Sequence, residues 1–108
     1  MNYSLDELAE QIHFTAVEKG FWPEDVDDIF IAKQCMMIVS EVTETMEAIR
    51  KDKGSLETVE EIADILIRTL DLWKGMQDNG YVNHSLDYAM EQKTAYNKTR
   101  EQKHGVRF

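Results

Sequence analysis

Apolar residues recur every three to four positions along most of the chain, which is the spacing of one face of an α-helix. This periodicity predicts four helices, at about residues 5–19, 29–51, 55–78 and 85–103. A capping-box pattern precedes the first helix, and a glycine lies just beyond the end of each helix. A fifth short helix or turn would follow Pro23. We therefore expect an all-α bundle of four to five helices.

The two central segments are the most apolar part of the chain. Segment 29–51 carries one broad apolar stripe, formed by Cys35, Ile38, Val39, Val42, Met46 and Ile49. Segment 55–78 is apolar over most of its circumference, and its acids form a narrow strip, comprising Glu60, Glu61, Asp64 and Asp71. A helix of this kind is typical of a buried position. So much apolar surface exceeds what one short chain can cover, so we expect a homodimer or homotetramer.

The length of 108 residues suits a single domain, spanning 1–108. The lone cysteine, Cys35, excludes an internal disulfide and a cysteine-based zinc site. The polar, acidic start is unlike a secretory signal peptide. No stretch approaches the roughly 18 apolar residues of a membrane span. We expect a cytoplasmic protein without a membrane partner.

Charge narrows the range of partners. The chain has 21 acidic and 12 basic residues, a net charge of −9, which argues against a nucleic-acid polymer as partner. Residues 1–92 carry 20 acids and 7 bases, whereas residues 93–108 carry one acid and five bases. An acidic body with a basic tail suits a metal on one element and phosphates on another. On charge alone, the simpler interpretation is that the basic tail only offsets the negative charge of the acidic body.

Two acidic pairs stand at helical spacing within the central segments, Glu41-x-x-Glu44 and Glu61-x-x-Asp64. A separation of three places both carboxylates of a pair on one helix face. If the two helices pack antiparallel, the pairs meet, and their repulsion requires protons or cations. Hard oxygen ligands suit Mg²⁺, with Mn²⁺ as a substitute. The alternative is ordinary surface acids, with Asp64 and Arg68 forming a salt bridge along the helix.

Around these pairs the sequence resembles a known family. SEVTETMEAIR at 40–50 and EEIADILIRTLDL at 60–72 are similar to the MazG-like all-α nucleoside triphosphate pyrophosphohydrolases, whose signature is ExxE followed after a gap by ExxD. Sixteen residues separate the two motifs here. The tail pattern Lys93, Asn97, Arg100 and His104-Gly105 is similar to the family's ending. The resemblance covers the chain from about residue 33 onward.

The resemblance implies an activity and a set of roles. Members hydrolyse a nucleoside triphosphate between the α and β phosphates with Mg²⁺, releasing a monophosphate and pyrophosphate. By that resemblance the metal ligands are the four acids of the two motifs, Glu41, Glu44, Glu61 and Asp64. Glu41 or Glu44 would also serve as the general base for the attacking water. Contacts to phosphate or sugar would come from Lys93, Asn97 and Arg100, which otherwise form a solvated basic face.

Other residues leave alternatives open. Trp22, with Phe21, would stack on a base or plug the end of the bundle. Lys33 would reach the substrate or extend its charged end into solvent. We expect Asp71 to form a supporting salt bridge. We expect each of the three histidines, His13, His84 and His104, to be an ordinary surface or capping residue. The rival functions are a same-fold enzyme acting on another pyrophosphate, such as phosphoribosyl-ATP, and a non-catalytic helical interaction module.

Overall fold

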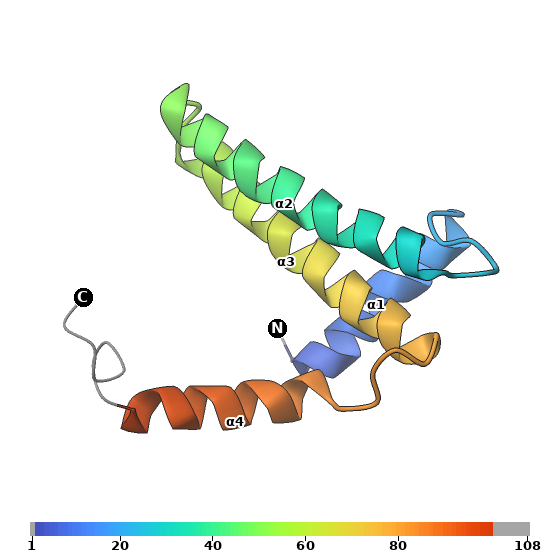
Figure 1. Ribbon diagram of the computed structural model, residues 1–108. Coiled ribbons are helices and arrows are strands. Elements are labelled where there is room, and N and C mark those ends of the chain that lie inside the picture. Colours follow the sequence, from blue (N-terminus) through green and yellow to red (C-terminus); the bar gives the residue numbers. More distant parts are fainter. Residues whose placement is uncertain (1, 101–108) are drawn as a thin grey trace.

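The computed structural model describes residues 2–100 and, within them, contains four α-helices and no strands (Figure 1). The helices are α1 (Leu5–Glu18), α2 (Asp28–Arg50), α3 (Ser55–Asp78) and α4 (Leu86–Thr99). The predicted all-α class is confirmed. Residues 24–27, after Pro23, form an irregular loop rather than a fifth helix. The C-terminal end expected for the last helix, and with it His104, lies outside the described residues.

Local side-chain chemistry explains where the helices begin. Ser4 Oγ accepts the Glu7 N–H at 3.1 Å, while the Glu7 carboxylate accepts the Ser4 N–H at 3.3 Å, which confirms the capping box. Asp27 caps α2 by accepting the Phe30 N–H at 2.8 Å. Gly54, the residue directly before α3, has a φ of 97°, a left-handed conformation that favours glycine.

The helices α2 and α3 run side by side as an antiparallel hairpin, and α1 crosses them at one end (Figure 1). In contrast, α4 extends away from the hairpin and packs on α1. Its first turn is fixed by reciprocal caps: Asp87 accepts the N–H groups of Leu5 and Asp6, at 2.8 and 3.1 Å, and Asp6 accepts the Asp87 N–H at 2.8 Å. Two helix N-termini therefore cap each other.

The core of the described chain is small. Its buried apolar residues are Ala9, Trp22, Ile31, Ala48 and Leu70. No large side chain among the described residues is fully covered. None of the described helices is long and apolar enough to span a bilayer.

Most of the predicted apolar surface of the hairpin is exposed in a single chain. One stripe on α2 comprises Met36, Val39, Val42, Met46 and Ile49, and one on α3 comprises Leu56, Val59, Ile62 and Leu66. The spacing of three to four residues places each stripe on one face of its helix. The sequence predicted that α3 is buried, but α3 is covered only where it packs on α1 and α2.

Candidate functional site

The four acids that were predicted to act together lie close to one another between α2 and α3. The carboxylates of Glu41, Glu61 and Asp64 each offer an oxygen within 4.8 Å of the others. Glu44 lies one helical turn after Glu41 on the same face of α2, near both Glu41 and Glu61. The antiparallel hairpin produces this arrangement, because it brings the two motifs to the same level. We call Glu41, Glu44, Glu61 and Asp64 the carboxylate cluster.

Two oxygens of the cluster are buried without a partner. Glu41 is 9% exposed, and its Oε2 has no hydrogen-bond donor among the described residues. The Oε2 of Glu61 is inaccessible and unpartnered in the same way. A buried polar atom without a hydrogen bond is destabilising, and a charged one more so. Hard anionic oxygens in this condition fit a divalent cation such as Mg²⁺.

Arg68 contacts the cluster from α3. Its Nε donates to Glu41 Oε1 at 2.7 Å, across the hairpin. The alternative of an Arg68–Asp64 salt bridge along the helix is thus wrong: the guanidinium bonds an acid of the facing helix. The hydrogen bond from Arg68 lowers the pKa of Glu41 despite the opposing effect of burial. The hydrogen bond with Glu41 and repulsion by its charge raise the pKa of Glu44 above its ordinary value.

A cleft of about 660 Å³ opens beside the cluster, between α1 and the hairpin. Its polar wall includes Glu41, Asp64, Arg68 and Asp71. The opposite wall comes from α1 and the loop after it, and includes Leu8, Gln11, Ile12, Ala16 and Phe21. Sequence reasoning missed this contribution of α1. The amphipathic pattern of residues 5–19 was the available signal, although it does not say what the apolar face covers.

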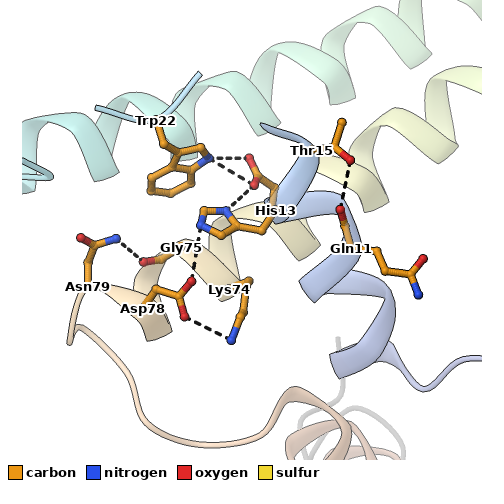
Figure 2. Close-up of polar contacts among 9 residues, drawn as sticks. Gln11, His13, Thr15, Trp22, Lys74, Gly75, Asp78 and Asn79 are labelled. Carbon is orange, nitrogen blue, oxygen red and sulfur yellow. Dashed lines mark hydrogen bonds and ion pairs between the residues drawn. The ribbon is translucent and has the colours of Figure 1, made fainter. Parts of the chain in front are cut away.

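A second polar cluster lies where α1 meets α3 (Figure 2), and one of its members, Asp71, also lines the cleft. His13 Nδ1 lies 2.7 Å from Asp71 Oδ1, and Trp22 Nε1 donates to Asp71 Oδ2 at 3.0 Å. His13 Nε2 is 3.6 Å from the Asp78 carboxylate. The surface or capping role predicted for His13 is wrong, because the residue is only 6% exposed. The supporting ion pair predicted for Asp71 agrees with its contact to His13.

Trp22 is part of this interior rather than of the cleft wall. The indole packs edge-on against His13, with ring centroids 4.8 Å apart. It also covers Gly75 so closely that a Cβ there would overlap the ring. Of the two aromatic candidates in this loop, Phe21 lines the cleft and Trp22 is buried. A direct contact between Trp22 and a base remains a prediction.

The remaining predicted substrate residues do not lie with the carboxylates in a single chain. Lys33 is exposed on α2, eight residues or about 12 Å along the helix from Glu41. Lys93 and Asn97 are exposed on α4, and Arg100 is exposed at its C-terminal cap. Since α4 extends away from the hairpin (Figure 1), its basic face does not line the cleft described above.

In comparisons with models of protein families, with curated proteins and with solved structures, no match to this chain was found. The resemblance to the MazG-like enzymes therefore stands on the sequence motifs. The geometry of the carboxylate cluster and its cleft has to be interpreted on its own chemistry.

Proposed function

We propose that the protein is a MazG-like pyrophosphohydrolase that cleaves nucleoside triphosphates between the α and β phosphates with Mg²⁺. The observation that carries the proposal is the carboxylate cluster with two buried, unpartnered oxygens, Oε2 of Glu41 and of Glu61. Such a set fits a cation, and the adjoining cleft offers apolar surface to a ligand bound next to it.

Each part of the site has a task in this reaction. Glu41, Glu44, Glu61 and Asp64 would hold divalent ions, which supply charge neutralisation at the phosphates when bound. A carboxylate of the α2 pair, Glu41 or Glu44, accepts the proton of the attacking water. The apolar wall from α1, with Phe21, packs on the nucleoside and limits the access of water.

The proposal includes a homo-oligomer. The apolar stripes of α2 and α3 are exposed in one chain, and pairing two hairpins into a four-helix arrangement would bury them. A second copy could also bring its own α4, with Lys93 and Asn97, to the carboxylate cluster. Val42→Glu should then dissociate the assembly, as measured by sedimentation velocity. Ser40→Glu, which adds the same charge on another face of α2, should not.

Pyrophosphate release from a panel of NTPs and dNTPs, with and without Mg²⁺, tests the activity. Phosphoribosyl-ATP belongs in the panel because it represents the same-fold rival. Glu61→Gln and Asp64→Asn should each lower the rate at least about hundredfold, since each removes charge that stabilises the transition state. Glu60→Gln is the matched control, because Glu60 is the exposed neighbour of Glu61.

A rate unaffected by the cluster substitutions, or cleavage of no member of the panel, would rule out the proposed activity. The interaction-module rival would then account for the exposed apolar stripes.

A further inference from the structure

Arg68 differs from the other cations of the hairpin in the acid that it pairs with. Four other cations pair along their own helix or its end: Arg50 and Lys51 with Glu47, Lys53 with Glu57, and Lys74 with Asp78. Arg68 instead reaches across the hairpin to Glu41, whose side chain is only 12% exposed. The hydrogen bond of 2.7 Å therefore places a positive charge inside the carboxylate cluster.

One guanidinium does not neutralise this cluster. Arg68 satisfies Oε1 of Glu41, whereas Oε2 of Glu41 and Oε2 of Glu61 stay unpartnered. A divalent ion that binds those oxygens would lie close to the guanidinium. Like charges at such distances repel strongly, so metal and Arg68 compete for Glu41.

The cleft offers a place for the displaced side chain. Arg68 lines the cleft together with Asp64 and Asp71, so its guanidinium remains at the cleft wall when it leaves Glu41. The side chain is 37% exposed, which leaves it room to turn. The planar guanidinium presents paired N–H donors that match the oxygens of a phosphate.

We propose that Arg68 is an exchangeable counter-ion of the site: it holds Glu41 while no metal is bound, yields to a divalent ion, and then binds the phosphates of the ligand. The role rests on the proposed function, since a nucleotide supplies the phosphates. It makes Arg68 a substrate-binding residue that is free for the substrate only after the metal has bound.

Opposite changes in metal affinity and in nucleotide affinity, both in the variant Arg68→Gln, distinguish this role from a purely structural one. Arg68→Gln should bind Mn²⁺ about tenfold more tightly than the wild type, because a competing positive charge is gone. With saturating Mg²⁺, the same variant should bind an α,β-methylene nucleoside triphosphate about tenfold more weakly, because a charged hydrogen bond to phosphate is lost. A residue that only holds the structure together would weaken both interactions when replaced.

The experiment is calorimetric titration of the metal-free protein with Mn²⁺ alone, followed by titration of the Mg²⁺-loaded protein with the nucleotide analogue. Arg68→Lys retains the charge and should bind Mn²⁺ as the wild type does. Arg50→Gln is the matched control, because it removes the same charge at an exposed site nine residues, or about 13 Å along α2, from Glu41. Its Mn²⁺ affinity should stay within about twofold of the wild type.

A measurement on the wild-type chain keeps the proposal testable if Arg68→Gln does not fold. The Nε–H signal of Arg68 in a nitrogen-15 spectrum should move when Mg²⁺ is added, because the bond to Glu41 breaks.

An unmoved signal, or a folded Arg68→Gln protein that binds Mn²⁺ no more tightly than the wild type, overturns the exchange. Unchanged affinity for the analogue overturns the phosphate contact. Failure of the wild type to bind Mn²⁺ overturns the metal site of the proposed function and the exchange with it, a result separate from the others.

Discussion

Two acids of α3, Asp71 and Glu61, show opposite states of a carboxylate in a protein interior. Asp71 accepts the indole N–H of Trp22 and lies against His13 Nδ1, so both of its oxygens have partners. Glu61, ten residues earlier on the same helix, has a buried oxygen with none. Asp71 thus belongs to a polar network that joins α1 to α3. The unpartnered oxygens of the carboxylate cluster mark the place where a ligand from outside the chain would complete the structure.

The largest effect is expected from breaking the network at Asp71. Asp71→Ala leaves the buried His13 and the Trp22 N–H without their acceptor, which should lower the free energy of unfolding by about 3 kcal/mol. Urea denaturation followed by circular dichroism measures this loss. Glu60→Ala, on the exposed side of the same helix, should change it by less than about 0.5 kcal/mol. An equally small effect of Asp71→Ala would mean that the network does not stabilise the packing of α1 on α3.

The carboxylate cluster should respond to metal, whereas the network should not. At Mg²⁺ concentrations about a hundredfold above the dissociation constant, the wild type should gain about 2.7 kcal/mol. Glu61→Gln should lose most of this gain, and its metal-free form should be more stable than the wild type because repulsion is relieved. Thermal melts with and without Mg²⁺ measure both effects. Asp71→Ala should keep the gain, since Asp71 is not a member of the cluster; loss of the gain there would remove the distinction between the two groups.

The sequence predicted the helices well because their signals are local. Ser4 and Glu7 form the predicted capping box, and the periodicity located the two long helices within a few residues. The ExxE and ExxD pairs could be predicted to converge, because a short connection forces α2 and α3 to run antiparallel. Once that connection is known, the number of residues between it and each motif decides whether the two motifs lie opposite each other.

The parts of the site that depend on tertiary packing could not be predicted. Arg68 has an acid four residues before it, at the spacing of a helical salt bridge, yet it bonds Glu41 on the facing helix. His13 lies between Ile12 and Phe14 in the sequence, which does not say whether its own side chain is covered; it is buried because α1 crosses α3 at that point. The direction of α4 depends on the capping contacts between Asp6 and Asp87, two residues 81 positions apart. No periodicity along the chain encodes such pairings.

The smallest effects are in the acid range, where the two kinds of carboxylate should differ in sign. Burial by itself would raise the pKa of Asp87. The N–H donors of Asp6 and Leu5 outweigh this effect and lower the pKa below its ordinary 3.8. Asp87 therefore stabilises the fold above about that pH, and this stabilisation is lost as the pH falls through the lowered pKa. The hydrogen bond with Glu41 raises the pKa of Glu44 above 4.5, so its contribution is present at low pH and is lost as the pH rises through the raised pKa. Metal-free melts across this range should show that Asp87→Asn destabilises the protein more at pH 6 than at pH 3. Glu44→Gln should instead stabilise it more at pH 6 than at pH 3, and the same sign for both variants would contradict the opposite pKa shifts of Asp87 and Glu44.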